Sequence, residues 1–189
     1  LLTAIQYFSF AKIGLPYMAV GRNLAYRKDT FYKANGFISH IKIKSGDDDL
    51  FVNQAATKEN IASCISDDSF TISKAETSFK NWFKQKRRHV STAHHYKFEH
   101  KFLLSLFYST QLLFWCLAIT LLLLLFKPLI VISIIVFRLI FQYIIIGKSA
   151  IKLKETDTIW LLPFLDFFLV ISQFSIFISN LLSKPKHWR

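Results

Sequence analysis

Residues 102–126 read FLLSLFYSTQLLFWCLAITLLLLLF, a run of 25 residues without a charged side chain. As an α-helix this run extends about 37 Å, long enough to cross the hydrocarbon core of a bilayer with some tilt. Lys127 and Pro128 follow it, and proline cannot continue a helix interior. The run therefore predicts a membrane-spanning helix over residues 102–126.

Two further apolar segments follow, and they extend this helix into an all-α transmembrane bundle of about three helices. The second predicted span is 129–146, which carries Arg138, and the third is 159–182, which carries Asp166. A charge inside a span is costly unless it is paired or hydrated. Since both side chains fall at a similar depth, we expect an Arg138–Asp166 ion pair; the alternative is a polar lining for a lipid-phosphate or glycan path.

The distribution of Lys and Arg predicts the orientation of the spans. Six Lys and Arg residues lie between Lys84 and Lys101, just before the first span, whereas Lys127 alone lies in the next turn. We therefore expect the polar part on the cytoplasmic side of the membrane, and we expect that membrane to be a bacterial inner (plasma) membrane. Three crossings leave the basic tail 184–189 outside, which conflicts with the positive-inside rule. Either the tail is tolerated there, or the third segment is a re-entrant or interfacial helix pair bent at Pro163. We predict three spans.

The chain divides after Lys101 into a polar part and a hydrocarbon-rich part. Residues 1–101 hold 16 Lys and Arg against 9 Asp and Glu, while residues 102–189 hold 8 against 3. This mixture excludes an intrinsically disordered chain, a disulfide-rich secreted domain and a purely soluble globule. The chain starts at Leu1, without Met and without the basic region of a signal peptide, so we expect an N-terminal portion to be missing.

The polar part, residues 1–101, alternates short β-like and helix-like segments, which predicts an α/β fold. The segments that resemble strands are 17–20, 23–27, 61–65 and 70–72, and those that resemble helices are 30–35, 47–60 and 78–90. The last of these helices is basic and amphipathic, and we expect it at the membrane surface.

Three consecutive carboxylates, Asp47, Asp48 and Asp49, follow Gly46. Acidic residues suit the first turn of a helix, where the helix dipole favours negative charge. Crowded carboxylates also raise one another's pKa, which suits a general base. Calcium binding is a third interpretation, although the spacing is not that of an EF-hand. The three Asp residues are the candidate catalytic residues.

A basic and a glycine-containing segment accompany the acidic one. Gln85, Arg88 and His89 follow Trp82 in the amphipathic helix; anionic lipid explains this basic stripe better than nucleic acid does, because a span adjoins it. An Arg and an amide at helical spacing also suit a diphosphate. Gly21 and Asn23 precede an apolar strand-like segment, which suggests backbone close to a ligand.

The segments follow one another in the order GRNLAYR (21–27), GF (36–37), GDDDL (46–50), WFKQKRRH (82–89) and then the membrane bundle. This order resembles the C-terminal part of a membrane-bound family 2 glycosyltransferase. That family includes cellulose- and hyaluronan-synthase-like and ceramide-glucosyltransferase-like enzymes. The resemblance implies that residues 1–101 are the C-terminal part of a GT-A-type α/β catalytic domain and that residues 102–189 are its membrane region.

The resemblance also implies roles for residues. The acidic motif would supply the base that deprotonates the acceptor hydroxyl, Asp48 in one register and Asp47 in the other. Gln85, Arg88 and His89 would match the family's Gln-x-x-Arg-Trp motif, which closes over the donor diphosphate and the acceptor. His89 replaces the Trp, and Trp82 is the residue expected to compensate. Gly21 and Asn23 would lie near the acceptor.

The implied function is inverting transfer of a sugar from a nucleotide-sugar donor to a membrane-associated lipid or glycan acceptor. The family's Mg²⁺ or Mn²⁺ ligands lie upstream of the motifs present here, so we expect no metal ligands in this chain and no activity of the chain alone. The alternative is a non-enzymatic membrane scaffold or a lipid-binding subunit.

Overall fold

The chain is largely helical in a computed structural model that describes residues 1–43 and 45–183. About 70% of the described residues are helical. The basic tail 184–189 considered above lies outside the described residues. The α-helices of the described part are α1 (Leu2–Lys12), α2 (Lys28–Lys33), α3 (Asp47–Ala55), α4 (Phe79–Thr92), α5 (Phe98–Leu123), α6 (Pro128–Lys152) and α7 (Leu162–Leu182).

The chain forms two compact units. The first unit consists of Leu1–Ile5 and Phe102–Phe174, and the second of Gln6–Lys101 together with the chain from Ser175 onward. The division after Lys101 matches the change in composition. Two segments are exceptions: Leu1–Ile5 belongs to the unit of the membrane helices, and the chain from Ser175 onward belongs to the unit of the polar part.

The predicted α/β fold of the polar part is wrong, because the described residues contain no β-strand. Some of the segments read as strands are extended: Val20 has φ −108° and ψ 116°, and Leu24 has φ −120° and ψ 126°. Between them, Gly21–Asn23 forms a 3₁₀ turn. A strand requires a hydrogen-bonded neighbour as well as an extended backbone, and the alternating pattern predicts only the latter. The GT-A-type assignment of the fold falls with the sheet.

The helices of the polar part agree better with the sequence. α3 begins at Asp47, as predicted, and α4 starts after Ser78, whose hydroxyl accepts a hydrogen bond from the Asn81 amide at 3.3 Å. α2 ends at Lys33, and the chain then turns through Asn35 and Gly36, whose φ angles are +56° and +58°; glycine adopts this conformation without steric cost. Buried Leu50, Phe51 and Val52 of α3 form the centre of the apolar core of this unit.

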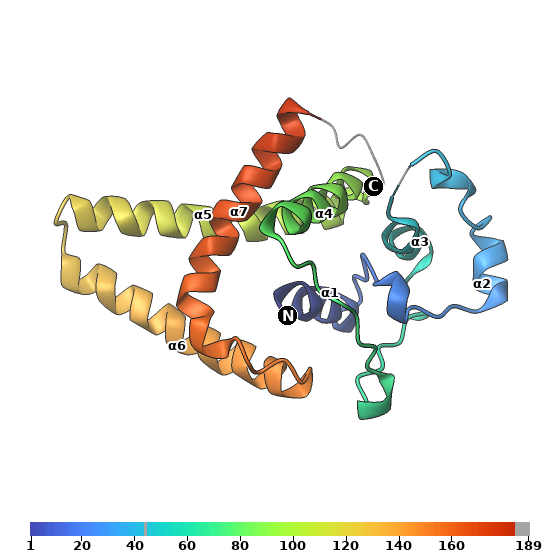
Figure 1. Cartoon of the computed structure of the whole chain (residues 1–189), viewed down its shortest axis with the longest axis horizontal. Helices are drawn as coiled ribbons and strands as arrows, with labels where there is room; N and C mark the ends of the chain where they lie inside the picture. Colours follow the sequence, from blue (N-terminus) through green and yellow to red (C-terminus); the bar gives the residue numbers. More distant parts are fainter. Residues whose placement is uncertain (44, 184–189) are drawn as a thin grey trace. The chain divides into compact units, whose positions relative to one another are not determined.

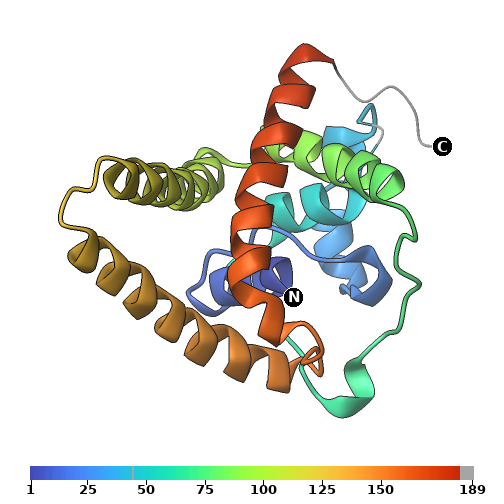
Figure 2. The same cartoon turned by 60° about the vertical axis from the view of Figure 1, so that its left-hand side comes forward.

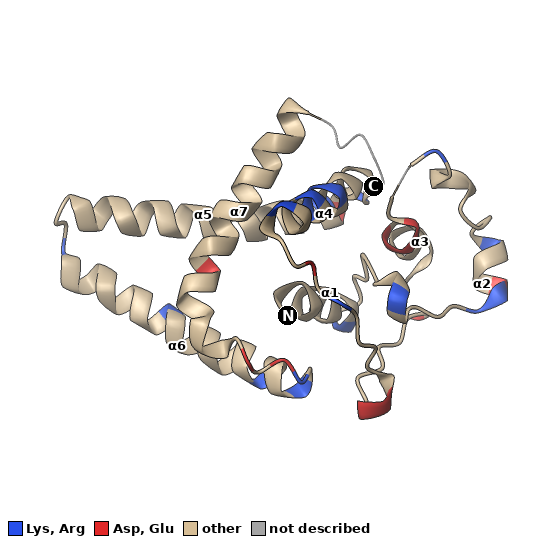
Figure 3. Cartoon of the chain, viewed as in Figure 1, with Lys and Arg blue, Asp and Glu red and all other residues tan. Residues whose placement is uncertain are grey.

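Three helices, α5, α6 and α7, are long and apolar enough to cross a membrane, which confirms the prediction of a membrane protein. Figure 3 shows how few charged residues these helices carry in comparison with α4. The first two are longer than expected. Pro128 occupies the first turn of α6 after Lys127, whose φ is +42°, because proline is preorganised for that position.

The third helix differs from expectation in its course. Pro163 lies in the first turn of α7, so α7 continues from Leu162 to Leu182 without a bend at this proline. In the first unit, Figures 1 and 2 show α5 and α6 as the arms of a hairpin, with α7 crossing them rather than lying along them.

Candidate functional site

The acidic motif forms the N-terminal turn of α3, packed against α4. Gly46 precedes it in the left-handed conformation, with φ +83°. A Cβ atom on Gly46 would lie 2.7 Å from Cγ2 of Thr92 in α4, a distance that side chains do not tolerate. Glycine at this position is therefore what allows the start of α3 to approach α4.

Asp48 joins the acidic motif to the glycine motif. Its Oδ2 accepts a hydrogen bond from the backbone N–H of Gly21 at 2.7 Å, and its Oδ1 accepts one from the N–H of Asp49 at 2.9 Å. A Cβ on Gly21 would lie 3.1 Å from Oδ2. Two segments that the sequence separates by 27 positions thus meet, and Asp48 is held in a fixed orientation while remaining half-buried.

Asp49 points into the unit and is only 7% exposed. Burial, together with the neighbouring charge of Asp48, raises the pKa of Asp49 to about 7, although hydrogen bonds to Tyr96 and Thr92 oppose the shift. Desolvation penalises a carboxylate that has no cation beside it. Asp49 is therefore a buried group that binds a proton near neutral pH, whereas Asp47 is exposed.

Thr92 and Tyr96 complete the surroundings of Asp49. Thr92 is 1% exposed, and its hydroxyl donates a hydrogen bond to the carbonyl of His89 at 2.7 Å. Burial and the charge of Asp49 raise the pKa of Tyr96, so Tyr96 keeps its phenolic proton. The hydroxyl groups enclose Asp49, which leaves Asp48 as the more accessible carboxylate of the pair.

The third motif lies on α4, and its C-terminal end reaches the acidic turn. Desolvation and the positive charges of Lys86 and Arg88 lower the pKa of His89, while the charge of Asp48 raises it. Gln85 and Trp82 lie about one and two turns before His89 on α4, and Trp82 stacks on Phe79 with ring centroids 5.5 Å apart. Of the α4 motif, His89 is thus the residue that lies close enough to Asp48 for the charge of that carboxylate to act on it.

Asn23 holds the turn of the glycine motif to another part of the same unit. Its side-chain Nδ2 donates a hydrogen bond to the carbonyl of Ser69 at 2.8 Å, which ties the turn at Gly21–Asn23 to a later loop. Among the described residues, no group of three or more His, Cys, Asp or Glu side chains is arranged to hold a metal ion, so these residues do not fit the Mg²⁺ or Mn²⁺ of the resembled family.

The sequence interpretation missed the buried polar residue Asn53, which braces α3 one turn after Asp49. Asn53 Nδ2 donates to the carbonyl of Tyr17 at 3.0 Å and lies 2.9 Å from Nδ1 of His100. Its Oδ1 accepts the N–H of Lys97 at 2.9 Å. An Asn directly after the apolar residues 50–52 was the signal, because a buried amide requires partners.

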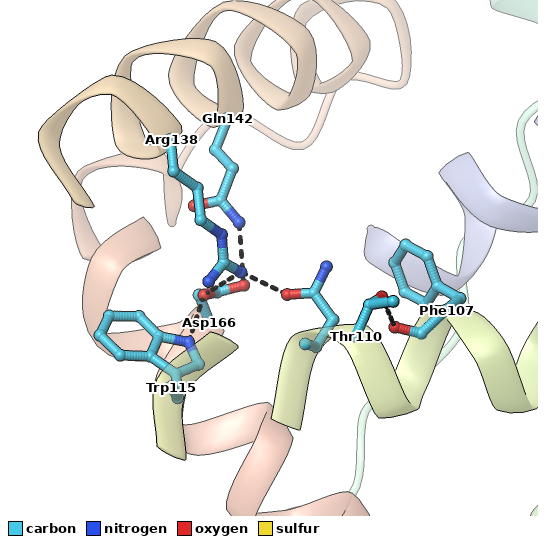
Figure 4. A network of polar contacts seen from close by, with 7 residues as sticks. Phe107, Thr110, Trp115, Arg138, Gln142 and Asp166 are labelled. Atoms are coloured by element: carbon cyan, nitrogen blue, oxygen red, sulfur yellow. Dashed lines mark hydrogen bonds and ion pairs between the residues drawn. The ribbon is translucent and has the colours of Figure 1, made fainter. Parts of the chain in front are cut away.

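A second polar cluster lies in the first unit, among the membrane helices (Figure 4). Arg138 of α6 and Asp166 of α7 form the predicted ion pair at 2.8 Å. Asp166 also accepts hydrogen bonds from Trp115 Nε1 at 2.9 Å and Gln142 Nε2 at 3.0 Å. Arg138 donates to Gln111 Oε1 as well, and its guanidinium lies over the ring of Phe114, 4.2 Å from the centroid.

Comparison with known proteins gives this chain no relative. No protein-family model matches it, and no curated protein or solved structure matches it either.

Proposed function

We propose that this chain carries the acceptor-activating part of a membrane glycosyltransferase, which transfers a sugar from a nucleotide-sugar donor to a hydroxyl of a lipid or glycan acceptor with inversion at the anomeric carbon. The observation that supports the proposal is the hydrogen bond from Gly21 to Asp48 at the start of α3, beside the end of α4. It joins two of the motifs that carry the resemblance, independently of their order in the sequence.

Asp48 is the proposed general base. The acceptor hydroxyl proton passes to the Asp48 carboxylate while the acceptor oxygen bonds to the anomeric carbon. The bond between that carbon and the nucleoside diphosphate breaks on the opposite face, which inverts the configuration. Each Asp48 oxygen accepts one backbone N–H, and a carboxylate retains further lone pairs for a substrate hydroxyl.

The α4 residues are proposed to stabilise the leaving diphosphate. Arg88 offers paired N–H donors that suit phosphate oxygens, Gln85 offers an amide on the preceding turn, and His89 lies close enough to Asp48 to respond to its charge. A divalent metal, as the resembled family uses, would have to be held by residues outside those described here, and no step is assigned to it.

The test is sugar transfer by membranes from cells that express the complete gene encoding this chain. Radiolabelled UDP-glucose, UDP-N-acetylglucosamine, UDP-galactose and GDP-mannose serve as donor probes, and label is counted in the lipid extract and in the insoluble glycan. We expect one donor to label a product and Asp48→Asn to lower the initial rate about 10²–10⁴-fold, the usual contribution of a general base.

The result that would overturn the proposal is an Asp48→Asn rate equal to that of the unaltered protein. A complete absence of transfer from all four donors, with the protein present in the membrane, would favour the non-enzymatic alternative. In that case the basic face of α4 is best interpreted as a contact for anionic lipid headgroups, with which the membrane helices are compatible.

A further inference from the structure

The C-terminal end of α7 is bound to α4 through Arg87. Arg87 Nε donates to Asn180 Oδ1 at 2.9 Å, and Nη2 donates to the carbonyl of Ser179 at 2.8 Å. Nη2 also donates to the carbonyl and the hydroxyl of Ser183. In return, Asn180 Nδ2 donates to the carbonyl of Arg87 at 3.1 Å. One guanidinium thus binds two carbonyls at the C-terminal end of α7, where the Ser179 carbonyl also accepts the N–H of Ser183 at 3.0 Å.

Arg87 makes these bonds from a side of α4 that the candidate site does not use. Arg87 and Thr92 are five positions apart, which is about 1.4 turns of an α-helix, so they lie on different sides of α4. Thr92 meets Gly46 at the start of α3, whereas Arg87 meets the end of α7. The second unit therefore contains both the candidate site and the last turn of a membrane helix.

The start of α5 is held at the same place by the covalent chain. α4 ends at Thr92, a single 3₁₀ turn follows over Ala93–His95, and α5 begins at Phe98. Phe98–Lys101 belongs to the second unit, as does the end of α7. The first residues of the membrane region and Ser183, its last described residue, are thus both fastened to α4.

From this arrangement we propose that α7 does not cross the membrane but enters and leaves it on one side, the side of α4. α5 and α6 are joined by the short turn 124–127 and form a hairpin, so two crossings return the chain to the side from which α5 started. If α7 also ends on that side, the number of its crossings is zero.

The contacts at the start of α7 fit a re-entrant course. Asp166, in the second turn of α7, binds Gln142 and Arg138, which lie about 15 and 21 Å before the end of α6. The Tyr143 hydroxyl donates to the carbonyl of Trp160 at 3.4 Å. The segment after α6 therefore runs back along α6 before α7 begins, and α7 starts at the depth of the middle of the hairpin.

From that depth α7 proceeds towards the level at which α5 starts. Asp166 contacts Trp115, whereas Val170, one turn later, accepts a hydrogen bond from the hydroxyl of Tyr108 at 3.4 Å. Tyr108 lies two turns closer to the start of α5 than Trp115. This course also removes the conflict with the positive-inside rule, since two Lys and one Arg follow Ser183 in the sequence and the rule favours the side of α4 for them.

The test compares three single cysteines in sealed membrane vesicles of both orientations. Cys64 and Cys116, both free, are first replaced by Ser. Ser73→Cys then reports the side of the polar part, Lys127→Cys the α5–α6 turn, and Ser183→Cys the end of α7. A membrane-impermeant maleimide is the probe, and labelling after detergent treatment shows that each thiol can react.

We expect Ser73→Cys and Ser183→Cys to be labelled in vesicles of one orientation and Lys127→Cys in vesicles of the other. Labelling of Ser183→Cys together with Lys127→Cys would overturn the proposal and restore three crossings. A protease-recognition tag placed after Arg189 repeats the comparison without altering α7: cleavage in the vesicles that label Ser73→Cys supports the re-entrant course, and cleavage in the other vesicles overturns it.

Discussion

Asp49 and Asp166 are almost equally buried, at 7% and 8% exposure, yet the two regions accommodate a buried carboxyl group in different ways. Asp166, between membrane helices, has a cation at 2.8 Å and two further N–H donors. Asp49, at the start of α3, has neighbouring carboxylates and hydroxyl groups. The membrane region neutralises its carboxylate with Arg138, whereas the polar region does so with a proton.

The difference indicates what each region does. An ion pair fixed by several partners from three helices holds those helices together. A carboxyl group that exchanges a proton near neutral pH, next to an oriented and accessible carboxylate, suits proton transfer. The Arg138 cluster therefore fits a structural role, while the acidic turn of α3 has the features that the proposed proton transfer requires.

The largest effect is expected at Arg138. Arg138→Leu leaves Asp166 buried without its cation, and breaking a buried pair in this way costs about 3–5 kcal/mol. The apparent melting temperature of the detergent-solubilised protein should fall sharply, and the combined change Arg138→Leu with Asp166→Leu should recover most of the loss. If the double variant melts no higher than Arg138→Leu, the ion pair does not hold the helices together.

The second prediction is that the stability of the folded protein depends on pH through Asp49. Because the pKa of Asp49 is raised in the folded state from 3.8 to about 7, the folded state binds more protons than the unfolded state between these values. Stability then falls as pH rises through this range, by at most about 1.4 kcal/mol per pH unit, and levels off above pH 7.

Asp49→Asn tests this dependence, because Asn resembles the protonated acid in shape and cannot titrate. Melting temperatures should be similar for both proteins at about pH 4, below which both states of the unaltered protein hold the proton, and the variant should melt increasingly higher as the pH rises to about 7. Curves that run parallel over the whole range would show that Asp49 does not hold a proton.

A third comparison concerns two glycines, one in each region. Gly46→Ala introduces a Cβ 2.7 Å from Thr92 Cγ2 at φ +83°, so we expect a loss of about 1–3 kcal/mol. Gly147 of α6 has no atom within 4 Å of its added Cβ, and Gly147→Ala should gain about 0.5–1 kcal/mol. Equal melting temperatures for the two variants would contradict the close packing of α3 on α4.

The smallest effect is expected at the start of α4. Ser78→Ala removes the hydroxyl that accepts the Asn81 amide, and loss of an N-cap costs about 1 kcal/mol. Ser73→Ala, in the exposed segment before α4, is the matched control. Thermal melts should separate the two variants by a few degrees, and no separation would mean that the cap contributes nothing.

The sequence predicted the features that depend on local pattern. The three apolar helices, the start of α3 at Asp47 and the amphipathic α4 follow from hydropathy, helix-dipole preference and periodicity. The strands were wrong because pairing depends on partners that a local pattern does not reveal. The Arg138–Asp166 pair was predicted because two charges at similar depth in a membrane have few alternatives.

The site was predicted only in part, for the same reason. The resemblance grouped Gly21, Asp48 and His89. The structure joins Gly21 to Asp48 by a hydrogen bond, and His89 lies close enough for the charge of Asp48 to raise its pKa. It did not indicate that Thr92 and Tyr96 would enclose Asp49, or that Asn23 would bind Ser69, because these contacts arise from packing between segments distant in the sequence.

The most direct test of the central claim, that Asp48 rather than its neighbour activates the acceptor, is the ratio of initial sugar-transfer rates of Asp47→Asn and Asp48→Asn, measured in the same membranes at equal protein levels. Both changes remove one negative charge from the first turn of α3, but only Asp48 binds Gly21. We expect Asp47→Asn to retain most of the initial rate, and this rate to exceed that of Asp48→Asn about 10²-fold or more. A ratio near one, or a greater loss in Asp47→Asn, would contradict it.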